Sequence, residues 1–157
     1  MVFESPTKGR LTQEQMYKDI LSYIAQDTQS RYKLIVGTDS HTRTQTLFVT
    51  AIVIHRLGKG GRYYFHKYER RAVRSLRQKI LYETSMSLTL AAKLTSWIEQ
   101  TGLQKDLDVE IHCDVGHRGE TKELIREIVG MVTGSGYQAA IKPDSFGASK
   151  VADKHTK

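Results

Sequence analysis

Hydrophobic residues follow two different spacings along the chain, and these spacings predict the order of its helices and strands. Between residues 12 and 26, apolar side chains recur every three or four positions, which is typical of an amphipathic helix. Thr12, with Gln15 three positions later, resembles a capping box, which marks the start of a helix. We therefore expect residues 1–30 to form an N-terminal helical extension.

The next three hydrophobic segments have the length and composition of strands. They cover residues 32–39, 46–56 and 62–69, and the second is apolar on both faces, as a central strand would be. Only short polar links separate them, and the link over residues 57–61, LGKGG, has the composition of a turn. Short links of this kind favour an antiparallel meander.

In the second half of the chain, helical and strand patterns alternate. We expect a long helix over 75–100, a strand over 106–114, a helix over 121–136, a strand over 137–144 and a last helix over 146–157. A helix that joins two strands makes a right-handed crossover, which leaves those strands parallel. Numbered along the chain, the five strands should then lie in the order 3-2-1-4-5, with strand 2 antiparallel.

This order describes an α/β fold, a mixed five-stranded sheet flanked by helices. A chain of 157 residues has the usual size of one domain, so we assign residues 1–157 to a single domain. In open α/β sheets, ligands bind at the carboxyl ends of the strands, next to the point where the strand order reverses. Here that point lies between the first and fourth strands.

Acidic residues stand at the ends of the strands around this point. The first strand ends at Asp39, the fourth at Asp114 and the fifth at Asp144. Glu83 falls on the apolar stripe of the long helix, where a carboxylate is costly unless it is paired or binds a metal. We expect these four carboxylates to meet in one site.

Such a cluster of carboxylates predicts a divalent cation. Two carboxylates about 4 Å apart repel each other by roughly 4 kcal/mol at an effective dielectric of about 20. Hard oxygen ligands select Mg²⁺ or Mn²⁺, and two such ions side by side can drive phosphodiester hydrolysis. The predicted catalytic and metal-binding residues are Asp39, Glu83, Asp114 and Asp144.

The same residues also have purely structural interpretations. An aspartate after a strand often forms a turn or caps the next helix. Glu83 could instead lie at the edge of the helical stripe and pair with Arg77 or Lys79. A third arrangement, a transition-metal site, is suggested by the spacing of His112, Asp114 and His117.

The segments IVGTDSH (35–41), HCDVGHRGETKELIREIVGMVTGSG (112–136) and IKPDSFGASKVADKHTK (141–157) carry a resemblance that extends over nearly the whole chain. They resemble the YkuK-like family of bacterial proteins, which is classed in the ribonuclease-H-like superfamily. The resemblance implies a ribonuclease-H-like fold and a carboxylate site for divalent metal ions.

The superfamily places an acidic residue on the first strand, a glutamate on the first long helix and an aspartate at the end of the fourth strand. Asp39, Glu83 and Asp114 match these positions. A last acidic residue follows the fifth strand or lies on the final helix, so Asp144 and Asp153 both match it. The segment around Asp144 is similar to type 2 ribonucleases H, although those enzymes carry Asp-Glu where this chain has Asp39-Ser40.

The net charge of +7 favours a polyanionic partner such as nucleic acid. Basic residues gather between 67 and 79, a segment that could also be a solvated linker. Arg118 precedes a predicted helix and could hold a phosphate there, while His117 could relay protons. The residues expected to bind RNA, DNA or a hybrid are Lys67, Arg70, Arg71, Arg74, Arg118 and Lys150.

Composition also narrows the cellular setting. The single cysteine, Cys113, excludes an intramolecular disulfide and a zinc ribbon, and it favours a reducing compartment. No apolar run reaches the roughly 20 residues that span a bilayer, and the first residues lack the apolar core of a signal peptide. We expect a cytoplasmic protein with no membrane partner; the sequence carries no sign of its oligomeric state.

These observations predict a divalent-metal-dependent nuclease or phosphodiesterase that acts on nucleic acid. The alternative is a catalytically inactive nucleic-acid-binding or scaffold module that keeps the same fold. Metal-dependent cleavage separates the two, because only the first requires it.

Overall fold

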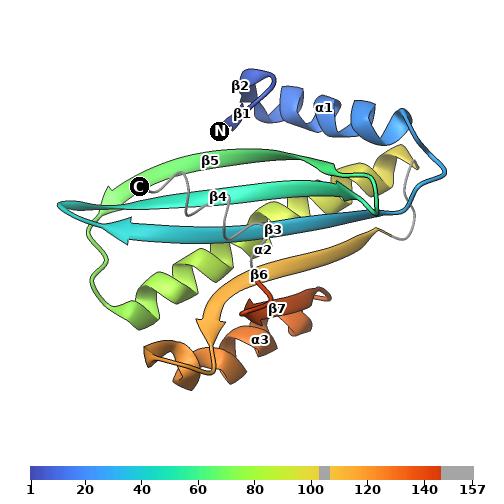
Figure 1. Cartoon of the computed structure of the whole chain (residues 1–157). Helices are drawn as coiled ribbons and strands as arrows, with labels where there is room; N and C mark the ends of the chain where they lie inside the picture. Colours follow the sequence, from blue (N-terminus) through green and yellow to red (C-terminus); the bar gives the residue numbers. More distant parts are fainter. Residues whose placement is uncertain (103–106, 146–157) are drawn as a thin grey trace.

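The computed structural model describes residues 1–102 and 107–145, and its strands form one mixed sheet (Figure 1). The sheet order is β2-β1-β5-β4-β3-β6-β7. The predicted last helix over 146–157, together with Lys150 and Asp153, lies outside the described residues. The strands are β1 (Val2–Ser5), β2 (Gly9–Thr12), β3 (Tyr32–Thr42), β4 (Gln45–Arg56), β5 (Gly61–Arg71), β6 (Asp108–Gly116) and β7 (Gln138–Lys142).

The five predicted strands are present in the predicted order, as β5-β4-β3-β6-β7. Strand β4 is antiparallel to both β3 and β5, whereas β6 is parallel to both β3 and β7. The predicted number of strands is wrong, because a hairpin of β1 and β2 adds two more at the edge of the sheet. Glu4 of β1 pairs with Phe65 of β5.

This hairpin also corrects the prediction of a purely helical N-terminal extension. The chain turns through Gly9, whose φ of 73° is in the left-handed region that glycine adopts without strain. Phe3 is fully buried, so the hairpin fixes its place on the sheet by contributing to the core. The predicted helix follows as α1 (Gln13–Ala25), and its N-terminus has the predicted capping box of Thr12 and Gln15.

The helices of the second half largely follow the predicted pattern. The long helix α2 (Leu76–Thr101) begins at Ser75, whose side chain accepts a hydrogen bond from the Gln78 N–H, and ends at Gly102 with φ of 72°. The helix predicted over 121–136 is divided into a 3-10 turn, η1 (Glu120–Leu124), and α3 (Ile125–Gly134).

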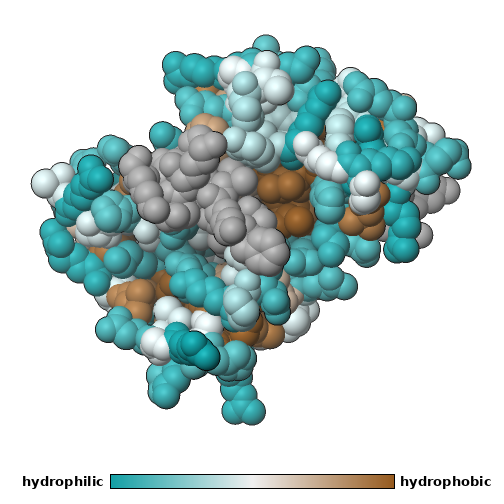
Figure 2. All heavy atoms as spheres, in the orientation of Figure 1, coloured by the Kyte–Doolittle hydropathy of each residue, from teal (hydrophilic) through white to brown (hydrophobic). Residues whose placement is uncertain are grey.

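One face of the sheet carries the main hydrophobic core. Helices α1 and α2 pack together there, with the rings of Tyr17 and Trp97 4.5 Å apart. The opposite face has a smaller buried cluster of Val49, Ala51 and Phe65. Viewed as in Figure 1, the surface is mainly hydrophilic with small hydrophobic areas (Figure 2). No helix among residues 1–102 and 107–145 is long and apolar enough to cross a membrane.

The central parallel pair of strands separates before it ends, and this separation makes room for a site. Pairing of β3 with β6 runs from Lys33 and Asp108 to Gly37 and His112, and stops there. Both strands continue beyond the paired part, and the register of β6 against β7 shifts between His112 and Gly116. A polar pocket can form only where the backbones no longer bond to one another.

Candidate metal centre

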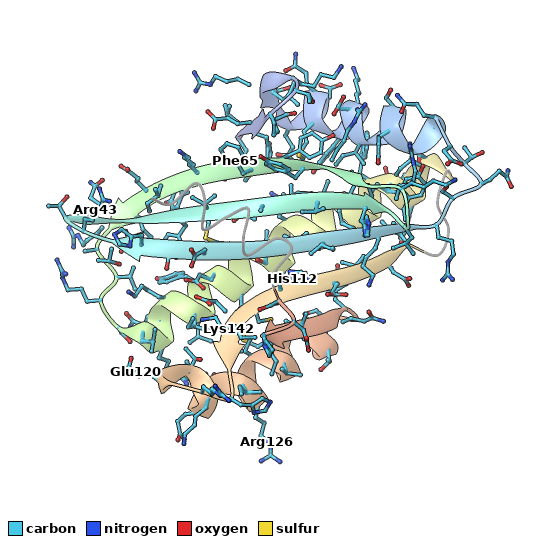
Figure 3. The ribbon with its side chains drawn as sticks, viewed as in Figure 1. Arg43, Phe65, His112, Glu120, Arg126 and Lys142 are labelled. Carbon is cyan, nitrogen blue, oxygen red and sulfur yellow. The ribbon has the colours of Figure 1, made fainter. Side chains whose placement is uncertain are left out.

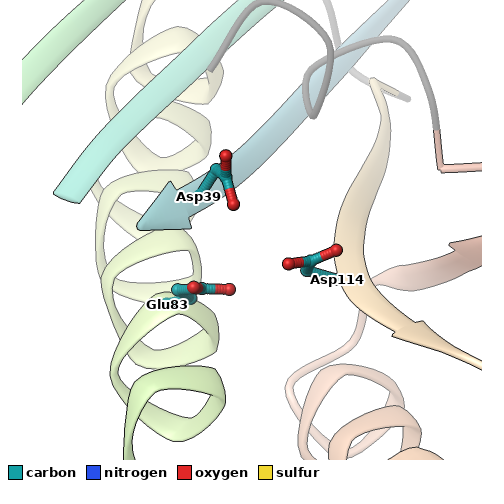
Figure 4. Close-up of side chains that lie close together, drawn as sticks. All are labelled: Asp39, Glu83 and Asp114. Atoms are coloured by element: carbon teal, nitrogen blue, oxygen red, sulfur yellow. The ribbon is translucent and has the colours of Figure 1, made fainter. Parts of the chain in front are cut away.

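Three carboxylates meet where β3 and β6 separate (Figure 4). Asp39 lies on β3 and Asp114 on β6, each two residues beyond the last paired position, and Glu83 reaches them from α2. One oxygen from each of the three lies within 4.8 Å of the others. The sequence-based expectation that residues 39, 83 and 114 come together therefore agrees with the geometry.

Glu83 is the most deeply placed of the three. Its side chain is only 5% exposed, and its Oε2 accepts a hydrogen bond of 2.6 Å from the Ser40 hydroxyl. Its Oε1 is buried and has no hydrogen-bond partner within the described part of the chain. Burial raises the pKa of Glu83 well above its usual value, and the negative charges of Asp114 and Asp39 raise it further, while Ser40 opposes this.

Hydroxyl groups join the two elements that carry Asp39 and Glu83. Thr38 and Ser87 share a hydrogen bond of 2.7 Å between β3 and α2, and Thr38 also bonds to Thr50 of β4 at 2.9 Å. The sequence pattern predicted a position for Glu83 but no hydrogen bonds for its neighbours. It missed these bonds because the pattern cannot say which hydroxyls face one another across a sheet and a helix.

Asp114 already has a cationic partner. Its Oδ1 lies 2.6 Å from the ammonium nitrogen of Lys142 at the end of β7. The Asp114 side chain is 28% exposed and the Lys142 side chain 56%, so this ion pair faces solvent on one side. Sequence reasoning did not single out Lys142. Its position directly before Pro143-Asp144, a segment already under consideration, was the available signal.

The donor set fits a hard divalent cation. All three groups are carboxylates, which are the ligands that Mg²⁺ and Mn²⁺ prefer. A cation would satisfy the buried Oε1 of Glu83, which costs free energy while it remains without a partner. Asp39 and Asp114 would supply the remaining charge that a divalent ion requires.

Asp144 does not belong to the group of three. It is exposed in the turn after β7, and its backbone N–H donates to the Ile141 carbonyl at 2.8 Å. The turn interpretation therefore describes its backbone. The competing residue, Asp153, lies outside the described residues.

Two structural alternatives, a Glu83–Arg77 pair and a helix cap by Asp114, are not realised. Arg77, which could have paired with Glu83, makes two hydrogen bonds to Glu127 at 2.6 and 2.8 Å. The turn after β6 begins η1 at Gly119 with no side-chain cap, so Asp114 does not serve as its cap.

The proposed histidine spacing does not form a metal site within residues 1–102 and 107–145. Buried His112 contacts Glu110, with Nε2 2.8 Å from Oε1, and burial lowers the pKa of this imidazole. His117 is exposed. Among the described residues, the side chains that could hold a metal ion together are Asp39, Glu83 and Asp114, and neither histidine is one of them.

A pocket opens beside Lys142, the partner of Asp114, and basic side chains line part of it. Its walls come from the end of β6, the following turn and the end of β7. Two predicted residues, His117 and Arg118, are exposed there together with Lys142. The complete lining is Gly116, His117, Arg118, Lys142 and Pro143.

The predicted basic patch between 67 and 79 is divided by strand geometry. Successive residues of β5 point to opposite faces, so Lys67 and Arg71 lie on one face and Arg70 on the other. The Lys67 ammonium lies 5.9 Å from the centre of the Phe65 ring, whereas the Arg70 guanidinium stacks 4.3 Å from that of Tyr82 on α2. Arg74 donates to the Arg43 carbonyl at 3.4 Å. The patch is thus not one continuous surface.

Comparison with known proteins agrees with the fold. The Ribonuclease H-like family profile matches residues 15–157. The chain is 36% identical over 168 residues to a protein described as "Uncharacterized protein YkuK" of Bacillus subtilis (strain 168), and this alignment covers 99% of the chain and 97% of the relative. No solved structure matches the chain.

Proposed function

The chain belongs to the ribonuclease H-like family, and from this we propose that it is a divalent-metal-dependent nuclease or phosphodiesterase acting on nucleic acid. The observation that carries the proposal is the buried oxygen of Glu83, which has no partner in the described part of the chain and lies beside two aspartates. A purely structural role would not explain three carboxylates at one point, because they repel one another when they are ionised.

In this proposal Asp39, Glu83 and Asp114 hold the cation. A bound Mg²⁺ or Mn²⁺ supplies charge for the attacking and leaving oxygens of a phosphodiester. The residues of the chain position it: Ser40 orients the Glu83 carboxylate, and Thr38 with Ser87 fixes β3 against α2. We propose that His117 moves protons at the exposed side of the site. The residues proposed to contact the nucleic-acid backbone are Lys67, Arg70, Arg71, Arg74 and Arg118. Asp144 is not one of the ligands in this proposal, because it lies in an exposed turn outside the group of three.

A cleavage assay tests this proposal directly. Single-stranded RNA and DNA, the duplexes and an RNA–DNA hybrid are incubated with the protein and Mg²⁺, Mn²⁺ or EDTA. We expect cleavage only with metal. Asp39→Asn and Asp114→Asn should each reduce the rate by roughly 10³-fold, since each removes a charge worth several kcal/mol in the transition state.

Asp27→Asn is the matched control, because it also removes one carboxylate charge but lies after α1, away from the site. Its cleavage rate should equal that of the unmodified protein. Rates unchanged in Asp39→Asn and Asp114→Asn would refute the assignment. Salt-sensitive binding of nucleic acid without any cleavage would instead favour the catalytically inactive module.

A further inference from the structure

Lys142 connects the carboxylates to the neighbouring pocket. Its ammonium lies 2.6 Å from Asp114 Oδ1, which is also one of the three groups that meet at the proposed metal site. The same side chain lines the pocket with His117 and Arg118. Figure 3 shows Lys142 at the end of β7, beside the curved end of β6.

The backbone brings Lys142 unusually close to β6. Gly116 is in register with Lys142, and a Cβ atom added at Gly116 would lie 2.9 Å from the Lys142 Cβ and 3.7 Å from its Cδ. Any side chain at residue 116 would therefore push the lysine stem away from Asp114. Glycine at this position lets the stem run along the end of β6 toward the carboxylate.

The ammonium and a divalent ion compete for the same oxygen. With a positive charge already against Asp114, a metal ion must displace it or share the carboxylate with it. Lys142 can move, because 56% of its side chain is exposed and it stands on a flexible four-carbon stem. The adjacent pocket, which Arg118 and His117 also line, has space for the displaced side chain.

We propose, on the basis of the proposed function, that a divalent metal ion displaces the Lys142 ammonium from Asp114. The ammonium occupies Asp114 in the metal-free protein, and when a divalent ion binds it turns into the pocket lined by His117 and Arg118. There it binds a phosphate oxygen of the nucleic-acid backbone. The pocket is thus a phosphodiester subsite whose lysine becomes available only in the metal-bound protein.

Metal titration tests the first half of this proposal without any readout of activity. Mn²⁺ binding to the unmodified protein and to Lys142→Met is measured by calorimetry, or by the loss of the electron paramagnetic resonance signal of free Mn²⁺. The variant should bind Mn²⁺ about twofold to fivefold more tightly, the difference that a partly exposed ion pair supplies. Lys142→Arg should stay close to the unmodified protein.

Lys79→Met is the matched control, since Lys79 acts on Glu83 electrostatically from the first turn of α2. Its removal should raise the Mn²⁺ affinity less than the Lys142 substitution does. Equal effects would show that only the general field matters and would overturn the displacement. An affinity that is unchanged or weaker in Lys142→Met would overturn it as well.

The second half is tested by binding of a fluorescent single-stranded oligonucleotide in Ca²⁺, followed across salt concentrations. Lys142→Met should bind several-fold more weakly, and the slope of log affinity against log salt should fall by about 0.7, as for one lost phosphate contact. The loss should vanish in EDTA, where the lysine remains on Asp114. Inorganic phosphate should compete only at far higher concentration than oligonucleotide, and equal competition would assign the pocket to free phosphate.

The outcomes separate this proposal from the proposed function. If neither protein binds Mn²⁺, the metal site and the displacement both fall. If the unmodified protein binds Mn²⁺ and cleaves nucleic acid but Lys142→Met binds both ligands like it, only the role of Lys142 is refuted.

Discussion

Strand β3 has a polar cluster at each end, and the two clusters are opposite in character. At its start, the Tyr32 hydroxyl donates to the Asp27 carbonyl at 2.6 Å and accepts from Arg56 Nε at 3.0 Å. The Arg56 guanidinium also donates to the Tyr23 carbonyl and lies 4.1 Å from the centre of the Tyr23 ring. Nearby, Arg62 pairs with Asp19 at 3.2 Å. At the other end, three carboxylates share one place.

The difference indicates which cluster is complete without a ligand and which one could bind a cation. Around Tyr32, positive charges meet negative charges and oxygen acceptors, so the groups stabilise the fold without further ligands. Around Glu83, three carboxylates meet with only Lys142 as a counter-charge to one of them, and a buried oxygen has no partner among the described residues. We therefore expect this end to lower the stability of the protein when no cation is bound. Removing a hydrogen-bonding group at the Tyr32 end should therefore lower stability, whereas removing the carboxylate charge of Glu83 at the other end should raise it.

The largest effect on stability is expected from Tyr32→Phe, at the end of β3 where the polar groups are all paired. The substitution removes the hydroxyl that joins Arg56 to the Asp27 carbonyl, while the ring keeps its place in the core. The free energy of unfolding should fall by about 2–3 kcal/mol, since one of the lost bonds involves a charged group. Urea denaturation measures it. Tyr68→Phe, at an exposed tyrosine, is the control and should cost almost nothing.

The contrast between the two ends of β3 would be wrong if Tyr32→Phe left stability unchanged but abolished cleavage. That result would place function at the Tyr32 end. We expect instead that the folded fraction of Tyr32→Phe cleaves at the rate of the unmodified protein, because this cluster lies at the opposite end of β3 from Asp39.

At the unsatisfied end, Glu83→Gln should make the metal-free protein more stable. The amide has the size of the carboxylate but no charge, so repulsion from Asp39 and Asp114 ends and an N–H can face their oxygens. A gain of about 1–2 kcal/mol is expected at pH 8 in EDTA. With saturating Mg²⁺ the order should reverse, because only the unmodified protein retains the complete set of carboxylates and is stabilised by ligand binding.

The raised pKa of Glu83 also predicts how the stability of the protein changes with pH. Since the pKa of Glu83 is raised in the folded protein, the folded state holds a proton that the unfolded chain loses near pH 4.5. The contribution of Glu83 is therefore fully present below pH 4.5 and is lost as pH rises through the higher, folded-state pKa. Urea midpoints in EDTA should fall over this range for the unmodified protein relative to Glu83→Gln. Parallel curves for the two proteins would contradict the burial of a strained carboxylate.

Much of this arrangement could be predicted because it depends on local patterns. Asp39 and Asp114 follow apolar runs that are recognisable as strands, and the crossover rule makes those strands parallel neighbours. Glu83 is visible as a charge on an apolar stripe. The strand order of the central sheet follows from the same two rules, periodicity and the handedness of crossovers.

The missing parts depend on register and on short segments. The strands of the β1–β2 hairpin are four residues each, too short to show alternation, and only contact with β5 fixes them. Lys142 reaches Asp114 because of an irregular register between β6 and β7, which no single-strand pattern encodes. Asp144 was grouped with the carboxylates from its place after a strand, but the chain turns at Pro143 and leaves it exposed.

The smallest effect is expected from Ser40→Ala, which isolates one hydrogen bond within the unsatisfied cluster. Ser40 donates to Glu83 Oε2 at 2.6 Å and lowers the pKa of that carboxyl, so its removal should raise this pKa further. Because the metal requires ionised Glu83, the pH at which Mn²⁺ binding is half-maximal should move upward, with a stability loss of about 1 kcal/mol above it. Ser87→Ala, which removes a hydroxyl bonded to Thr38 instead, should destabilise the protein without moving that midpoint. The same midpoint in Ser40→Ala and in the unmodified protein would mean that Glu83 does not bind the metal in its ionised form, and the contrast between the two ends of β3 would lose its chemical basis.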